Sequence, residues 1–68
     1  MTDRELINAL IAQRRKAGLT QTAVAHRIGI TPSAINLFEN DTRRSPTMHT
    51  VLRYAKAIGA TITIQENQ

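Results

Sequence analysis

Residues 21–40, QTAVAHRIGITPSAINLFEN, constrain the fold more than any other part of the chain. They contain two short segments, 21–28 and 32–39, in which apolar residues recur three or four positions apart. This spacing places side chains on one face of a helix. Gly29 follows the first segment, and glycine adopts positive φ without steric cost. The stretch therefore predicts two short helices that pack together across a tight turn. Val24 and Ile28 face inward from the first helix, Ile35 and Phe38 from the second, and Ile30 fills the corner at the turn.

Both predicted helices have a recognisable start. Thr20 and Thr31 precede them, and a threonine hydroxyl at the N-cap accepts a hydrogen bond from a backbone N–H group of the first turn. Pro32 follows Thr31 at the first helical position, where the fixed φ of proline suits a helix. Ala25 provides a small side chain where the two helices would cross.

Two further helices are predicted around this pair. The first, over residues 3–17, opens with a capping box of Thr2 and Glu5 and ends before Gly18. The second, over residues 48–58, has apolar residues at helical spacing. The residues expected to be buried in it are Met48, Val51, Leu52, Ala55 and Ile58.

The segment that follows, residues 60–65, has the pattern of a strand. Its sequence, ATITIQ, alternates apolar and polar residues and is rich in β-branched side chains. A lone strand leaves its backbone groups unpaired, so we expect it to pair with the same strand of a second copy. The alternative is a frayed tail, or a strand that lies over the chain's own helices. The residues expected at this dimer interface are Thr61, Ile62, Thr63 and Ile64.

Composition narrows the range of partners. Nine Lys and Arg residues against five Asp and Glu residues give a formal net charge of +4, which favours a polyanion such as nucleic acid or an anionic membrane surface. No apolar run approaches the roughly 20 residues of a membrane span, and the first residues are too polar for a signal peptide. We therefore expect a cytoplasmic protein. The 68 residues include no cysteine, and the two histidines are isolated, so we expect no disulfide, metal or cofactor and favour oligomerisation to stabilise a small core.

The central stretch resembles the helix-turn-helix of the phage-repressor (Cro/cI-like, Xre) family of DNA-binding proteins. The resemblance covers roughly residues 6–59, including Arg14 before the motif and Glu39-Asn40 at its end. It implies an all-α, lambda-repressor-like domain of four helices that binds double-stranded DNA. Many relatives carry a fifth helix where this chain has the strand pattern. The motif residues that carry the resemblance are Gln21, Val24, Ala25, Ile28, Gly29, Ile30, Ile35 and Phe38.

In this architecture the second helix of the motif enters the major groove of DNA. Asn36 suits adenine, Ser33 suits several base edges, and Leu37 suits the methyl group of thymine. Because the helix contains no Arg, Lys or Gln, we expect contacts that favour A·T pairs, with DNA shape adding discrimination. Alternatively, Asn36 is a solvated polar residue and Leu37 covers a neighbour or a partner. The predicted base-contacting residues are Pro32, Ser33, Asn36 and Leu37.

Phosphate contacts are expected on either side of that helix. Gln21 begins the first helix of the motif, and a helix N-terminus favours an anion. The resemblance implies that Arg14 forms an ion pair with Glu39 and helps to position a phosphate. Arg43 and Arg44 would follow the DNA backbone or enter a narrowed minor groove, unless they are ordinary solubilising charges. The full set of predicted phosphate contacts is Arg14, Gln21, Thr22, Arg27, Asn40, Arg43 and Arg44.

These features predict a sequence-specific transcriptional regulator, by default a repressor. One motif reads too few base pairs to select a site, so we expect a homodimer on a palindromic operator. The alternative is an antitoxin that binds a toxin protein and regulates its own operon. An enzyme is not expected, because the sequence has no cysteine nucleophile, no Ser/His/acid or paired-carboxylate spacing, and no glycine-rich phosphate loop. No small-molecule substrate is expected either.

Overall fold

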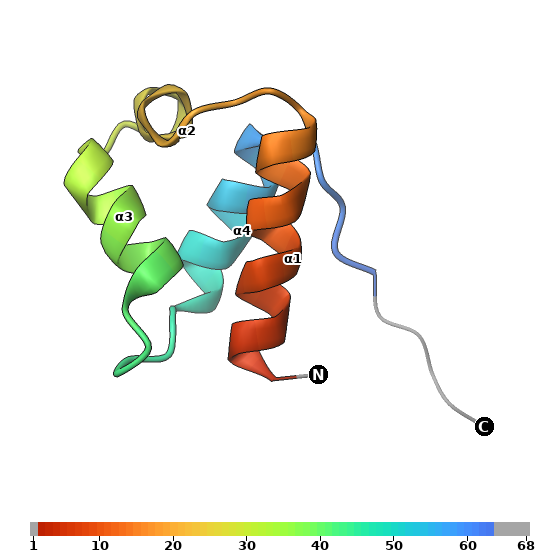
Figure 1. Ribbon diagram of the computed structural model, residues 1–68, viewed down its shortest axis with the longest axis vertical. Coiled ribbons are helices and arrows are strands. Elements are labelled where there is room, and N and C mark those ends of the chain that lie inside the picture. Colours follow the sequence, from red (N-terminus) through yellow and green to blue (C-terminus); the bar gives the residue numbers. More distant parts are fainter. Residues whose placement is uncertain (1, 64–68) are drawn as a thin grey trace.

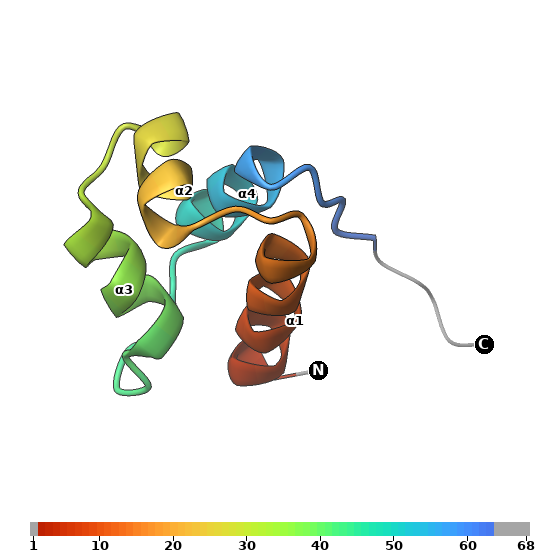
Figure 2. The ribbon, with the colours of Figure 1, turned by 45° about the horizontal axis from the view of Figure 1, so that its top comes forward.

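The structure is a computed structural model that describes residues 2–63 and contains four α-helices in that range (Figure 1). Figures 1 and 2 show α3 on the outer side of the molecule, away from the segment that follows α4, while α1 lies on the other side of α4. The predicted all-α class with four helices is confirmed. The helices are α1 (Asp3–Lys16), α2 (Gln21–Ile28), α3 (Pro32–Asn40) and α4 (Met48–Ala57).

Every helix begins at a threonine N-cap. In each case the hydroxyl accepts a hydrogen bond from the backbone N–H group three residues later, at distances of 3.0 to 3.2 Å. Each such cap satisfies one of the four N–H groups that a helix leaves without an internal partner, and contributes about 0.5–2 kcal/mol. The helix starts are therefore fixed by local sequence. The four caps are Thr2, Thr20, Thr31 and Thr47.

The turn between α2 and α3 is built around one glycine. Gly29 has φ 83° and ψ 31°, in the left-handed region, and ends α2. The N–H groups of Gly29 and Ile30 both donate to the carbonyl oxygen of Ala25, at 2.8 and 3.0 Å. This closure reverses the chain within three residues, so that α3 crosses α2 at once.

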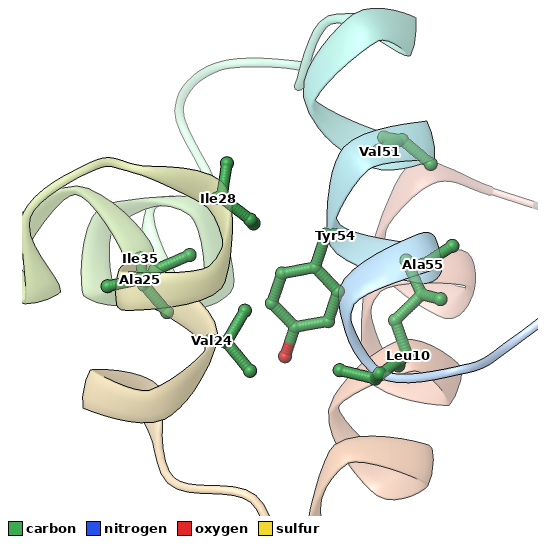
Figure 3. Close-up of a cluster of buried hydrophobic side chains, with 9 residues drawn as sticks. Leu10, Val24, Ala25, Ile28, Ile35, Val51, Tyr54 and Ala55 are labelled. Atoms are coloured by element: carbon green, nitrogen blue, oxygen red, sulfur yellow. The ribbon is translucent and has the colours of Figure 1, made fainter.

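The core lies between the helices and takes side chains from all four. Tyr54, Ile35 and Val24 are its largest fully buried members. Figure 3 shows the Tyr54 ring between residues of α2 and α3 on one side and Leu10 of α1 on the other. The core cluster is Leu10, Val24, Ala25, Ile28, Ile35, Val51, Tyr54, Ala55 and Ile58.

The buried face of α4 differs from the prediction. Met48 and Leu52 are 64% and 52% exposed, whereas Tyr54 is fully buried. The inward face follows Val51, Tyr54, Ala55 and Ile58. Because each residue turns the helix by about 100°, Leu52 lies well to the side of this line, despite its apolar side chain. The prediction that Met48 and Leu52 belong to the core is wrong.

The predicted C-terminal strand is not supported. In the part of it that the structure describes, residues 60–63, there is no β-structure. Ile62 packs partly buried against the core, while Thr61 and Thr63 are exposed. The physical reason is that residues 2–63 form no strand with which this segment could pair. Ile64 and the rest of the predicted strand lie outside the described residues.

The conformation of Gly29 gives a direct test of the turn. A Cβ atom at this position would meet nothing within 4 Å, so the cost of Gly29→Ala comes from the backbone alone. We expect a loss of about 1–2 kcal/mol in the free energy of unfolding, because alanine resists the left-handed region. Urea denaturation followed by circular dichroism measures it. Gly29→Asn is the control and loses less, since asparagine tolerates this conformation. Equal losses in the two variants would contradict this account of the turn.

Candidate nucleic-acid interface

One face of α3 points to solvent and carries the predicted base-contacting residues. Leu37 is 59% exposed, although it is apolar. The predicted base-contacting residues, together with Asn40 one turn after Asn36, fall within an arc of about 140° around the helix. The arc presents two amides, a hydroxyl and apolar groups, the kinds of side chain that contact base edges. The exposed residues of this face are Pro32, Ser33, Asn36, Leu37 and Asn40.

The opposite face of α3 is anchored in the core. Ile35 is fully buried, and the Phe38 ring lies 4.8 Å from the Tyr54 ring, centroid to centroid, at an interplanar angle of 31°. A tilted aromatic pair at this distance adds about 0.5–1.5 kcal/mol to the burial of the two rings. The side chains available for DNA therefore project from a helix whose back is packed.

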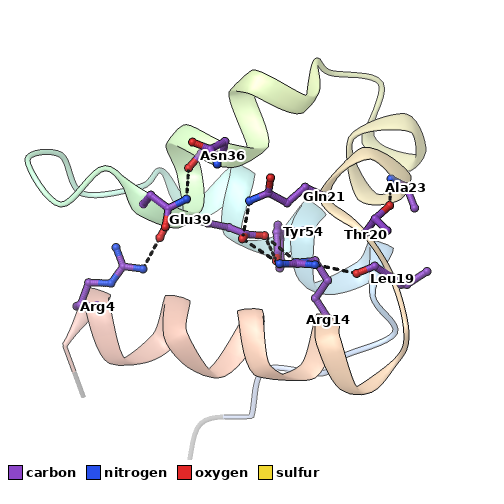
Figure 4. Close-up of polar contacts among 10 residues, drawn as sticks. Arg4, Arg14, Leu19, Thr20, Gln21, Ala23, Asn36, Glu39 and Tyr54 are labelled. Atoms are coloured by element: carbon purple, nitrogen blue, oxygen red, sulfur yellow. Dashed lines mark hydrogen bonds and ion pairs between the residues drawn. The ribbon is translucent and has the colours of Figure 1, made fainter.

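A buried carboxylate links α3 to the three other helices (Figure 4). Glu39 is 2% exposed. Its Oε2 accepts from Arg14 Nε at 2.9 Å and from the Tyr54 hydroxyl at 2.6 Å. Its Oε1 accepts from Gln21 Nε2 at 3.0 Å and from Arg14 Nη2 at 3.2 Å. Arg14 lies in α1, Gln21 in α2 and Tyr54 in α4. We refer to these four residues as the Glu39 network.

The Glu39 network keeps both of its charges ionised. Burial by itself raises the pKa of Glu39, but the hydrogen bonds from Gln21, Tyr54 and Arg14, together with the charge of Arg14, hold this pKa below its ordinary value. Burial acts to lower the pKa of Arg14, and the hydrogen bond and charge of Glu39 outweigh it, so the pKa of Arg14 is raised. Burial and the Glu39 carboxylate also raise the pKa of Tyr54, whose hydroxyl remains a donor.

The structure places Arg14 and Glu39 in the contact that the resemblance implied, but inside the protein. Arg14 is only 8% exposed, and its Nη1 donates to the carbonyl oxygen of Leu19 at 2.8 Å. Gln21 is half-buried at the start of α2, with Nε2 directed at Glu39. Since an amide nitrogen carries two hydrogens, the Gln21 side chain keeps one for a second acceptor. Thr22, next to it, is exposed.

Arg27 lies apart from this group, at the other end of α2. Its Nη1 donates to the carbonyl oxygen of Ala57, the last residue of α4, at 2.7 Å. Arg53 of α4 donates in turn to the carbonyl oxygen of Ile28, the last residue of α2. Each helix thus supplies a cation to the C-terminus of the other, where the helix dipole favours one. This contact gives Arg27 a structural role that the sequence did not predict.

The loop after α3 brings the remaining candidates next to the exposed face. Arg43 and Arg44 are exposed. Arg43 donates to Asp41 Oδ1 through its backbone N–H at 2.9 Å and through Nε at 3.2 Å. These hydrogen bonds, the backbone one above all, lower the pKa of Asp41. One surface hollow joins this loop to α3, and it is lined by Asn36, Leu37, Asn40, Asp41, Thr42 and Arg43.

Two other kinds of site are not formed by the described residues. Within residues 2–63, no three His, Cys, Asp or Glu side chains gather closely enough to hold a metal ion. Over the same range, none of the helices combines the length and the apolar character needed to cross a membrane.

These observations define a class of protein, and a family model agrees. The model, described as helix-turn-helix, matches residues 10–65. The chain therefore belongs to the helix-turn-helix family of DNA-binding regulators, of the Cro/cI-like (Xre) type.

The chain is also similar to particular known proteins. Antitoxin HigA1 from two strains of Mycobacterium tuberculosis, CDC 1551 / Oshkosh and H37Rv, is 36% identical over 61 residues, which is 90% of this chain. The chain spans 40% of the length of these relatives. Two solved structures superpose on the whole chain at 26% identity. A serine-to-alanine variant of HipB in complex with an O2 20mer gives a TM-score of 0.86 over 93% of that chain. A HipA-HipB-O2-O3 complex gives 0.85 over 94%.

Sequence reasoning did not find Tyr54 as a member of the site. A signal was present, because Tyr54 is three residues after Val51 and four before Ile58, on the inward face of α4. The acceptor for its hydroxyl is on another helix, so only the fold shows why a tyrosine is buried there.

Tyr54→Phe tests the Glu39 network and removes only a hydroxyl. We expect a loss of about 1.5–3 kcal/mol in the free energy of unfolding at pH 7, because the lost hydrogen bond is made to a charged group. The folded pKa of Glu39 is depressed, so this contribution is present above the ordinary glutamate pKa and disappears as pH falls through the folded value. Urea unfolding at pH 7 and pH 3 therefore shows a smaller difference between the two proteins at pH 3.

Ser45→Ala, which removes an exposed hydroxyl, is the matched control and stays within about 0.5 kcal/mol of the wild type. A difference between wild type and Tyr54→Phe that is the same at both pH values would show that the hydroxyl does not act through an ionised Glu39.

Proposed function

We propose that this protein is a transcriptional repressor that binds a palindromic operator as a homodimer, with α3 in the major groove. The observation that carries the proposal is the exposed face of α3, which presents base-contacting side chains while the other face is held by the core and by Glu39. A cytoplasmic location follows, because the operator is there. Repression is the simplest outcome when an operator overlaps a promoter, since the bound protein excludes polymerase.

In this proposal, affinity comes mainly from phosphates. Gln21 and Thr22 lie at the N-terminus of α2, where backbone N–H groups favour an anion. Arg43 and Arg44 extend from the loop after α3, and Asn40 is the last residue of that helix. The base-contacting residues lie between these two groups along the chain. Neutralising phosphates releases counterions, so binding is expected to weaken steeply with salt.

A homodimer is proposed because one α3 contacts too few base pairs for selectivity. Two copies related by a two-fold axis would place their α3 helices about 34 Å apart, on one side of the duplex. We assign the contact between copies to Thr61, Ile62, Thr63 and Ile64, of which Ile62 also packs against the core. A larger shared core would also stabilise a chain of this size.

Selection of bound duplexes from a random pool tests this function, followed by measurement of the stoichiometry on the recovered sequence. We expect a palindrome that binds two chains. Recovery of no consistent sequence, or binding that does not change between 50 and 200 mM salt, would contradict the proposal, since six to ten phosphate contacts predict a loss of about 10³- to 10⁵-fold.

Two substitutions separate the proposed roles of base and phosphate contacts. Asn36→Ala is expected to cost about 1–3 kcal/mol against the preferred base and to relax selectivity at one position of each half-site. Arg43→Ala is expected to weaken binding to all duplexes alike. It should also reduce the slope of log affinity against log salt by about 0.9 for each phosphate contact that is lost. Fluorescence anisotropy across single-base variants and salt concentrations measures both. Identical behaviour of the two variants would refute this assignment of roles.

A second candidate function is favoured by the comparisons. HigA1 is named as an antitoxin, and HipB is found with HipA in a solved complex. We propose as the alternative that this chain neutralises a toxin protein and regulates its own operon. On α4, outside the motif, Met48 and Leu52 expose apolar surface one turn apart, which would suit a protein partner.

Co-expression with the protein encoded next to it tests this alternative. We expect the two chains to elute together from a sizing column and the second chain alone to slow growth. Leu52→Lys, which places a charge on exposed apolar surface, is expected to weaken this association at least tenfold without unfolding the protein, while exposed Lys56→Ala is the control. Separate elution, with no effect on growth, would exclude the alternative for that pair.

A further inference from the structure

The C-terminal end of α3 receives its cation from another helix. The last turn of α3 contains no basic residue, although a helix C-terminus favours a positive charge. Arg4, in the first turn of α1, fills this role: its Nη2 donates to the backbone carbonyl oxygen of Glu39. Figure 4 shows the Arg4 side chain reaching from α1 to this end of α3.

The Arg4 guanidinium is held on a second side as well. Its Nε and Nη2 lie 3.4 and 3.2 Å from Asn8 Oδ1, one turn further along α1. Arg4 is half-buried and Asn8 is exposed. The planar guanidinium donates in fixed directions, so the two acceptors together determine where it points.

Arg4 and Arg14 fix the same residue of α3 from two points on α1. Arg14 holds the side chain of Glu39, and Arg4 holds its backbone. The two arginines are ten residues apart, about 15 Å along the helix axis. Without Arg4, the donors of α1, α2 and α4 hold Glu39 only by its side chain, whereas the Arg4 contact also holds the backbone of α3 at this residue. Glu39 directly precedes Asn40 and lies three residues after Asn36, so the position of its backbone affects where the exposed amides point.

We propose that Arg4 is a positioning residue for DNA recognition, which sets the orientation of the C-terminal half of α3 without contacting a base. This inference rests on the proposed DNA-binding function. Arg4 precedes residues 10–65, which the family model matches, so the role is assigned to this chain from its own contacts. The competing reading is a direct phosphate contact, because Arg4 borders a surface hollow that Arg43 and Arg44 also line.

Arg4→Ala compared with Arg15→Ala tests the proposal, since Arg15 is exposed on the same helix and its loss changes the net charge equally. Affinity is measured by anisotropy for the duplex that the wild-type protein selects from a random pool and for a random-sequence duplex of equal length. For Arg4→Ala we expect a roughly two- to fivefold loss on the selected duplex, the scale of one charge at a helix terminus. The loss on the random duplex is expected to match that of Arg15→Ala.

The outcomes separate the possible roles of Arg4. An equal loss on both duplexes, with a salt slope reduced by about 0.9 for each lost contact and so by about 1.8 for a homodimer, would mean a direct phosphate contact and would overturn the proposal. Indistinguishable behaviour of Arg4→Ala and Arg15→Ala would overturn it too. If the wild-type protein itself binds no duplex, the proposed function fails, and this result does not bear on the packing of Arg4.

A second variant and a second readout keep the test independent of overall stability and of DNA. Asn8→Ala removes one of the two acceptors that orient Arg4, and is expected to cause part of the loss of affinity seen for Arg4→Ala. The double variant Arg4→Ala/Asn8→Ala should bind no more weakly than Arg4→Ala alone. Without DNA, Arg4→Ala is expected to increase hydrogen exchange of the Asp41 amide, which bonds the Leu37 carbonyl, while the amides of α4 stay protected. Unchanged exchange at Asp41 would overturn the positioning role.

Discussion

The structure depends on one buried carboxylate. Glu39 is withdrawn from water at the meeting point of all four helices, and donors from α1, α2 and α4 satisfy both of its oxygens. A buried ion pair adds little net stability over an apolar substitute of the same shape, but removing one partner costs about 3–5 kcal/mol because a charge is left alone. A helix that moved out of place would have the same effect. The network therefore penalises wrong arrangements of the helices more than it stabilises the right one.

Apolar packing would define the direction of α3 less sharply than hydrogen bonds do. The burial of Ile35 is not directional, and the aromatic pair of Phe38 and Tyr54 has only a broad preference for geometry. Hydrogen bonds to a charged group depend on distance and angle. The directional contacts converge on Glu39, in the last turn of α3, whereas the exposed face begins at Pro32. The core thus holds α3 in place, and the polar contacts orient it.

The parts of this fold that could be predicted from the sequence depend on residues close together in the chain. A threonine cap involves residues three positions apart, a glycine turn two, and an amphipathic face three or four. The four helices could therefore be recognised in the sequence. The hydrogen bond from Tyr54 to Glu39 could not, because the acceptor lies 15 residues away on another helix. Arg4 was missed for the same reason, its partner being 35 residues distant. The strand prediction failed for a different reason. Alternation of apolar and polar residues identifies a segment that could pair in a sheet, but it does not show whether a neighbouring strand exists. For the candidate site, exposure of the α3 face is established, and its contacts with bases stay a prediction.

The composition of the exposed α3 face has a consequence for how this chain would discriminate between sequences. Its side chains are short and uncharged, so none forms the bidentate cationic contact that best identifies guanine. Short side chains reach bases only when the helix lies deep in the groove and at the right angle, whereas a long arginine tolerates some misplacement. Selectivity then depends on the orientation of the helix as much as on the identity of its residues. This dependence gives a physical reason why two arginines of α1 hold the last turn of α3, one through the buried carboxylate of Glu39 and one through its backbone.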